Sequence, residues 1–245
     1  YKPEALAAAT ARAASAKLAH GANILVKKGD ALIAFNTDGR GCVGYLERTG
    51  FSFSDAKVAI CGTGPTALAI LHAAAIAGAS EVLLLSRDKE RAREVLDRYV
   101  DEFGALAHAT VDLQAAVDGH RSFLTAYEQT MFKFGSYTTS TQAIAAADLI
   151  INATPLGMRE GDPAPFDVAL FREGQRAFDV VYAHGETAFA AGAKAAGCTF
   201  SDGGGMLVAQ AVATVQAVCD VSGIDCELSF DELFEIMANA ANFNV

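Results

Sequence analysis

The segment from residue 57 to 77, KVAICGTGPTALAILHAAAIA, limits the fold of this chain more than any other feature. Its short apolar run KVAIC is typical of a buried strand, and the apolar stretch from 65 to 77 predicts a helix directly after it. Gly62, Gly64 and Ala67 form a GxGxxA pattern at the junction. In such a turn, backbone N–H groups and the helix N-terminus can face a pyrophosphate. The pattern alone also fits a tight turn without a ligand, but its place between a strand and a helix favours dinucleotide binding.

The rest of the chain alternates between apolar runs and periodic segments. Strands are expected at 81–85, 148–152 and 177–182, and helices at 88–103, 186–196, 205–221 and 229–241. Alternation of this kind predicts a parallel sheet covered by helices on both faces. We therefore expect an α/β fold with a Rossmann-like doubly wound parallel sheet and a second, smaller α/β domain.

The first fifty residues and one internal segment have a different pattern. An Ala-rich stretch predicts a helix over 4–19, and NILVKKGDALIAF predicts two short strands around a Lys-Gly-Asp turn. A further helix is expected over 41–50, where Gly50 would end it. Residues 105–145 show no clear period, so we expect one helix and a long loop there.

Composition narrows the class of partner. The chain has 245 residues, 52% of them hydrophobic, and a net charge of −10 without a cluster of Lys or Arg. This balance argues against a nucleic acid or an anionic membrane as partner. No apolar run reaches the roughly 18 residues of a membrane span, so a cytoplasmic protein is expected. The cysteines are odd in number and lack CxxC spacing, which predicts neither disulfides nor a metal: Cys42, Cys61, Cys198, Cys219 and Cys226.

The strand expected at 81–85 is followed by Ser86, Arg87 and Asp88. At this place an acidic residue commonly bonds the ribose 2′-hydroxyl of NAD, whereas an Arg suits the 2′-phosphate of NADP. Arg87 therefore favours NADP, and Asp88 leaves NAD open. The basic residues that follow also fit a solvated helix face.

Five segments carry a resemblance to a known family. They are NTDGRG at 36–41, VAICGTGPTALA at 58–69, INATPLGM at 151–158, DVVY at 179–182 and GGGMLVAQA at 203–211. Their order and spacing resemble the shikimate dehydrogenase family. The chain departs from the family in reading GTGP where a glycine pair is usual, and in the greater length of 105–145. Pro65 removes one N–H from the turn, at a helix position where proline is tolerated.

The resemblance implies roles for residues outside the glycine turn. Lys2, in Tyr1-Lys2-Pro3, would be the family's catalytic lysine and Asp38 its partner, while Asn23, Tyr182 and Gln210 would contact the substrate. The chemistry suits these residue types, because reduction of a ring ketone by hydride needs a proton donor at the developing alkoxide. Amide side chains suit a polyol, since each offers donors and an acceptor. Taken singly, each residue has an ordinary structural explanation, so the assignment depends on their joint order.

The cofactor would be held along the ends of the parallel strands and at the start of the long helix near the C-terminus. The residues implied are Gly62, Thr63, Gly64, Pro65, Thr66, Ser86, Arg87, Asp88, Asn152, Thr154, Pro155, Met158, Gly203 and Met206. Core filling is the commoner role for the two methionines.

The resemblance implies a domain division and an activity. Residues 1–52 would be the remainder of a substrate domain whose first part is not in the sequence, 53–204 an NADP-binding Rossmann domain, and 205–245 helices that pack back on the substrate domain. The implied activity is reversible NADP-dependent reduction of 3-dehydroshikimate to shikimate in aromatic amino acid biosynthesis. An NAD-preferring quinate/shikimate dehydrogenase and a non-catalytic nucleotide-binding paralogue are the alternatives, and a homodimer is left open.

Overall fold

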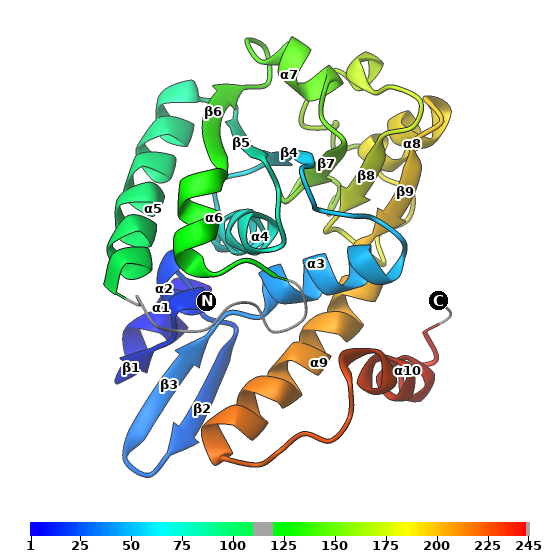
Figure 1. The fold of residues 1–245 in the computed structure, drawn as a ribbon. Helices are drawn as coiled ribbons and strands as arrows, with labels where there is room; N and C mark the ends of the chain where they lie inside the picture. Colours follow the sequence, from blue (N-terminus) through cyan, green and yellow to red (C-terminus); the bar gives the residue numbers. More distant parts are fainter. Residues whose placement is uncertain (110–119, 244–245) are drawn as a thin grey trace.

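Two sheets organise the protein in this computed structural model, which describes residues 1–109 and 120–243 (Figure 1). The larger sheet has strands in the order β6-β5-β4-β7-β8-β9, all parallel. The smaller has the order β1-β3-β2, with β1 parallel and β2 antiparallel to β3. The protein is thus α/β, with a Rossmann-like six-stranded sheet and a small mixed sheet, which confirms the predicted fold class.

The elements have the following bounds. The strands are β1 (Ala11–Arg12), β2 (Ile24–Lys28), β3 (Ala31–Phe35), β4 (Lys57–Cys61), β5 (Glu81–Ser86), β6 (Met131–Ser136), β7 (Leu149–Asn152), β8 (Arg176–Asp179) and β9 (Thr199–Asp202). The α-helices are α1 (Lys2–Ala8), α2 (Ala14–Leu18), α3 (Asp38–Arg48), α4 (Pro65–Ile76), α5 (Lys89–Ala109), α6 (Phe123–Gln129), α7 (Thr141–Ala145), α8 (Ala188–Ala195), α9 (Gly203–Ser222) and α10 (Phe230–Ala240). A 3₁₀ turn, η2, spans Val168–Leu170.

Both faces of the large sheet are covered by helices. Along β4, Val58 and Ile60 pack with side chains of α3, α4 and α5, whereas Ala59 and Cys61 pack with side chains of α7 and α8. Successive side chains of a strand point to opposite faces. Because both faces are buried, the strand is a continuous apolar run in the sequence rather than an alternating one.

The prediction of a single helix over 4–19 is wrong. Helix α1 ends at Ala8, and the chain extends before α2 begins at Ala14. Thr10 is the reason, because its backbone N–H donates to the Leu32 carbonyl at 2.9 Å and its Oγ1 accepts from the Leu32 N–H at 2.7 Å. These bonds place β1 beside β3. Tertiary pairing here overrides the helix propensity of alanine.

The expectation for 105–145 is also wrong in part. Within the described residues this segment holds the end of α5, helix α6, strand β6 and helix α7, and β6 is an edge strand of the large sheet. Residues 110–119 lie outside the described residues. Phe123 and Tyr127 pack edge-on against Phe103 of α5. The segment therefore extends the core instead of looping away from it.

Helix α9 connects the large sheet to the small one along the base of the molecule (Figure 1). By length and composition it could cross a membrane, with a mean hydropathy of 1.4 over eighteen residues, which the sequence prediction missed. In the structure it packs against α3 and α10, and Val208 and Val212 lie in a core cluster with Phe234. This packing accounts for its apolar composition.

The carboxyl ends of the parallel strands meet at one edge of the large sheet. Asn152, the last residue of β7, pairs with Cys61 at the end of β4 and with Asp179 at the end of β8. Ligands of open α/β sheets bind at this edge. The helices α1, α3 and α9 bring their polar residues to the same region.

Candidate active site

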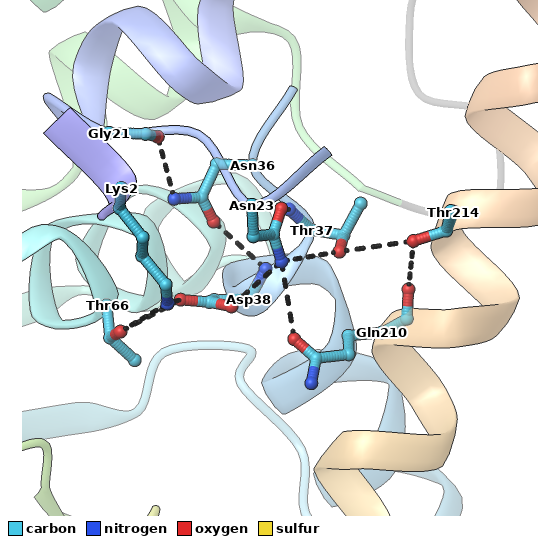
Figure 2. A network of polar contacts seen from close by, with 9 residues as sticks. All are labelled: Lys2, Gly21, Asn23, Asn36, Thr37, Asp38, Thr66, Gln210 and Thr214. Carbon is cyan, nitrogen blue, oxygen red and sulfur yellow. Dashed lines mark hydrogen bonds and ion pairs between the residues drawn. The ribbon is translucent and has the colours of Figure 1, made fainter. Parts of the chain in front are cut away.

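Lys2 and Asp38 form an ion pair across 36 positions of sequence. Lys2 is the first residue of α1, and Asp38 is the first residue of α3. The side chain of Asp38 is 4% exposed and that of Lys2 is 34% exposed. Thr66 Oγ1 accepts from Lys2 Nζ at 2.9 Å and donates to Asp38 Oδ2 at 2.9 Å (Figure 2). A carboxylate this deeply buried is tolerated because it has these charged and hydrogen-bonding partners.

The polar triplet Asn36-Thr37-Asp38 is buried, and hydrogen bonds explain each member. Asn36 donates through Nδ2 to the Gly21 carbonyl at 2.9 Å and accepts through Oδ1 from the Asp38 N–H at 3.0 Å. The Thr37 N–H donates to Asn23 Oδ1 at 3.0 Å. The triplet thereby fixes the first turn of α3 and holds the Asp38 carboxylate toward Lys2.

Asn23 connects this cluster to α9. Its Nδ2 lies 3.0 Å from Asp38 Oδ1, 3.0 Å from Thr37 Oγ1 and 3.3 Å from Gln210 Oε1 (Figure 2). An amide nitrogen carries two hydrogens, so three acceptors compete for them. The contact with Gln210 is the longest, and a ligand hydroxyl could replace it with little loss.

These side chains line one end of a cleft of about 740 Å³, a size suited to a small-molecule ligand. The rest of the lining is mostly apolar and comes from the segment after β8 and from α9 and α10. Its residues include Val180, Tyr182, Gly203, Met206, Leu207, Ala211, Val215 and Met237. The cleft thus has a charged, hydrogen-bonding end and an apolar wall.

The glycine turn after β4 has the geometry that a dinucleotide phosphate requires. Gly62 has a φ of 117°, and a Cβ atom there would lie 2.8 Å from the Ala153 carbonyl oxygen. A Cβ on Gly64 would meet nothing within 4 Å. Pro65 then begins α4, whose first N–H groups have no intrahelical acceptor. The open approach to Gly64 and these N–H groups fit the pyrophosphate of a dinucleotide cofactor.

Two charged residues after β5, Arg87 and Asp88, differ in whether their side chains already have partners. Asp88 Oδ1 accepts from the Glu90 N–H at 2.9 Å, so its carboxylate caps the first turn of α5. Arg87 is exposed, and its guanidinium has no hydrogen-bond or ion-pair partner among residues 1–109 and 120–243. The capping bonds use Oδ1 of Asp88 and occupy part of the capacity of this carboxylate to accept from a hydroxyl. Arg87 keeps its guanidinium available to an anionic group of a ligand.

Asn152 is fully buried, and its side chain shapes the loop that follows β7. Its Nδ2 donates to the Leu156 carbonyl and to Asp179 Oδ1, both at 3.0 Å, and its Oδ1 accepts from the Thr154 hydroxyl at 2.6 Å. Burial raises the pKa of Asp179, while a hydrogen bond from Thr187 favours its charged form. In a cofactor site, Asn152 would therefore act by holding this loop in place and not by contacting the cofactor.

Comparison with known sequences decides the family. Shikimate dehydrogenase (NADP(+)) from Moorella thermoacetica is 36% identical over 194 residues, which cover 78% of this chain and 57% of that protein. The protein of the same name from Caulobacter vibrioides (strain NA1000 / CB15N) is 30% identical over 221 residues, covering 89% of this chain and 67% of that protein. The chain belongs to the shikimate dehydrogenase family. No protein-family model matches it.

This shikimate dehydrogenase family chain spans 57% of the length of the first relative and 67% of the second. Solved structures extend the likeness to the fold. The ligand-free 5-ketofructose reductase of Gluconobacter sp. strain CHM43 covers 98% of this chain and 76% of its own, with a TM-score of 0.69 and 25% identity.

Two further structures match at lower identity and support the fold alone. Shikimate 5-dehydrogenase from Listeria monocytogenes, solved with shikimate and NAD, covers 96% of this chain and 74% of its own, with a TM-score of 0.71 and 22% identity. Quinate dehydrogenase from Corynebacterium glutamicum, solved with NAD, covers 98% and 75%, with a TM-score of 0.70 and 23% identity.

The structure brings one group of the residues implied by sequence into the cleft and leaves another along the sheet edge. The cleft group is Lys2, Asn23, Asp38, Thr66, Tyr182, Gly203, Met206 and Gln210. The remaining residues follow the strand ends without lining the cleft: Gly62, Thr63, Gly64, Pro65, Ser86, Arg87, Asp88, Asn152, Thr154, Pro155 and Met158. Met206 is 5% exposed and Met158 is 52% exposed, so only Met158 is open to solvent.

Two threonines of the cluster were not anticipated from sequence. Thr214 Oγ1 donates to the Gln210 carbonyl at 2.8 Å and lies 3.5 Å from Thr37 Oγ1. A signal existed for Thr214, because residues four apart on a helix share a face and Gln210 was already assigned to the cleft. Thr37 stood beside Asp38 in the polar triplet, but a threonine there also fits an ordinary helix cap.

Proposed function

We propose that this protein catalyses the reversible, NADP-dependent reduction of 3-dehydroshikimate to shikimate. The observation that carries the proposal is the Lys2 ammonium held by the buried Asp38 carboxylate at the polar end of the cleft. The names of the relatives support the reaction class, since both are NADP-dependent shikimate dehydrogenases.

The roles of the protein groups follow from the reaction's balance. A ketone, a hydride and a proton give an alcohol, and NADPH supplies the hydride when it is bound. Lys2 Nζ donates the proton to the carbonyl oxygen as negative charge develops there, and takes the hydroxyl proton in the reverse direction. Lys2 is part-exposed and can regain its proton from water, while Asp38 keeps the ammonium directed into the cleft.

Substrate recognition would rest on the amides at the same end of the cleft. Asn23 and Gln210 both present donors and acceptors; Asn23 bonds Asp38 directly, and Gln210 lies 3.3 Å from Asn23. Such a pair suits vicinal hydroxyl groups on a ring. Tyr182 is 42% exposed on the same cleft, where its ring can pack against a flat ligand.

A rival substrate has a specific observation in its favour. The 5-ketofructose reductase structure shares the fold at 25% identity, and its name describes reduction of a keto sugar. Amide donors and acceptors suit the hydroxyl groups of a keto sugar as well as those of a cyclic polyol acid. An NAD-preferring quinate/shikimate dehydrogenase is the other alternative, although the helix-capping role of Asp88 disfavours NAD.

The test is a panel of initial rates. Shikimate, quinate and the reduced partner of 5-ketofructose are each offered with NADP and with NAD, and cofactor binding is measured in parallel. Greatest kcat/KM with shikimate and NADP supports the proposal. Preference for another substrate would reassign the activity, and NADP binding without turnover of any substrate would favour a non-catalytic paralogue.

We further propose that the reaction serves aromatic amino acid biosynthesis in the cytoplasm. The five cysteines are free thiols, which agrees with a reducing compartment. A homodimer stays a prediction, as do the domain bounds 1–52, 53–204 and 205–245.

A further inference from the structure

Thr66 lies in the glycine turn after β4 (residues 62–66), which we call the cofactor turn. Its side chain nevertheless bonds Lys2 and Asp38, which we call the catalytic pair. Thr66 is the second residue of α4, two positions after Gly64, and the sequence places it among the cofactor-binding residues. Its Oγ1 accepts from Lys2 Nζ and donates to Asp38 Oδ2, each at 2.9 Å (Figure 2). A hydroxyl has a single proton. Once that proton is donated to Asp38, the side chain has none left for a phosphate oxygen, which only accepts.

Packing at Gly21 supports the same connection independently. A Cβ atom on Gly21 would lie 2.9 Å from Pro65 Cβ and 3.0 Å from Lys2 Cβ, so the backbone of Gly21 lies against both. The Ala22 N–H donates to the Lys2 carbonyl at 2.9 Å, and the Gly21 carbonyl accepts from Asn36. The ring of Pro65 is rigid, so this contact leaves the backbone of Gly21 little freedom to move. The cofactor turn is therefore packed against the support of the catalytic pair.

We propose that Thr66 is a positioning residue that ties the cofactor turn to the Lys2–Asp38 pair. This inference rests on the proposed function and specifies how the cofactor turn and the proton donor are held together. The first turn of α4 would present its N–H groups to the cofactor phosphates and its Thr66 hydroxyl to the proton donor. The cofactor phosphates and the proton donor would then be held by one rigid turn, and small misplacements of reacting groups are costly in rate.

The geometry of an ammonium shows what Thr66 adds. Lys2 Nζ has three N–H donors, of which one is directed to Asp38 and one to Thr66. With two directions fixed, the third N–H is left for the substrate oxygen. Without the Thr66 hydroxyl, the ammonium can rotate about its bond to Asp38, and water can compete because Lys2 is part-exposed.

The first test compares Thr66→Val, which replaces the hydroxyl with a methyl of similar size, with Thr66→Ser, which keeps the hydroxyl. In Thr66→Val we expect kcat to fall about 10- to 100-fold while the Kd for NADP changes less than threefold. Thr66→Ser should restore most of kcat. Thr141→Val, at an exposed position of α7, is the matched control and should leave both constants unchanged. A Thr66→Val variant with normal kcat but a Kd for NADP raised tenfold would make Thr66 a phosphate ligand and overturn the proposal.

A second test needs no substrate and so separates this proposal from the proposed function. The rate at which acetic anhydride modifies Lys2 is measured by mass spectrometry in the cofactor-free protein. We expect a several-fold faster reaction in Thr66→Val than in the unsubstituted protein and in Thr66→Ser, because Lys2 loses one of its two acceptors. Thr66→Ala gives the same comparison if the valine variant does not fold. Equal rates in all variants would overturn the proposal, whereas faster modification without turnover of any substrate would contradict only the proposed function.

Discussion

Buried polar side chains lie where segments distant in sequence meet. Asp38 and Asn36 are each at most 5% exposed, and Asn152 and Asp179 have no exposed surface. Lys2 and Asp38 could be assigned from the order of motifs that resemble the family. Thr66 could be placed in the turn but not paired with Lys2, because the direction of its side chain depends on how α1 packs against α4.

Arg87 offers a test of cofactor choice. Replacing it by alanine should raise KM for NADP about tenfold or more and leave KM for NAD unchanged, because only NADP carries the phosphate that the guanidinium would bond. Arg91→Ala is the matched control, since Arg91 is exposed on α5, which follows Arg87, and pairs with Glu94 at 4.0 Å. An equal effect of Arg87→Ala on both cofactors, measured by steady-state kinetics, would contradict this role.

At the scale of elements, the parallel strands and their helices could be predicted because their apolar runs are bounded by turn residues. Strand β6, MFKFGS, was missed because it is an edge strand with only Gly135 and Ser136 buried. Strand β9 was missed for a similar reason, since none of its four residues is buried. The break in the Ala-rich helix depends on Thr10 and Leu32, which come together only in the folded small sheet.

Replacing each glycine of the cofactor turn by alanine should affect a different property: stability at Gly62 and cofactor affinity at Gly64. Gly62→Ala should lower the free energy of unfolding by about 2 kcal/mol or more, because of its positive φ and the close Ala153 carbonyl. Gly64→Ala should change it by less than about 0.5 kcal/mol, since the added methyl meets open space. It should instead raise the Kd for NADP about tenfold by obstructing the phosphates.

Denaturant unfolding and cofactor titration of both variants decide the matter. A Gly64→Ala protein that binds NADP normally would show that the phosphates approach elsewhere. A Gly62→Ala protein of unchanged stability would show that the turn can relax around a side chain.

At the scale of the whole molecule, an aromatic cluster joins α4, α5, α6 and β6 on one face of the large sheet. His72 lies within it, edge-on to Phe103 and Phe123, with Nδ1 3.0 Å from the Tyr99 hydroxyl. Burial lowers the pKa of His72 from 6.5 to about 4. The cluster could not be predicted as such, because its members come from four elements that meet only in the folded protein.

His72 should make stability depend on pH. Its folded pKa is below its unfolded value, so its contribution is fully present above about pH 6.5 and is lost as the pH falls toward 4. Between pH 7.5 and pH 5 the free energy of unfolding should fall by about 2 kcal/mol from this group. His72→Gln should remove that part of the slope, whatever its stability at pH 7.5. Identical slopes in urea titrations of both proteins would contradict the assignment.

We propose that the Lys2–Asp38 pair supplies the proton that accompanies hydride transfer, and kcat of Lys2→Met with shikimate and NADP tests this role. Methionine keeps the length of the side chain and removes its proton donor. We expect kcat to fall about 100-fold or more, with the Kd for NADP unchanged within threefold. A variant that retains kcat within a few-fold of the unsubstituted protein would contradict it.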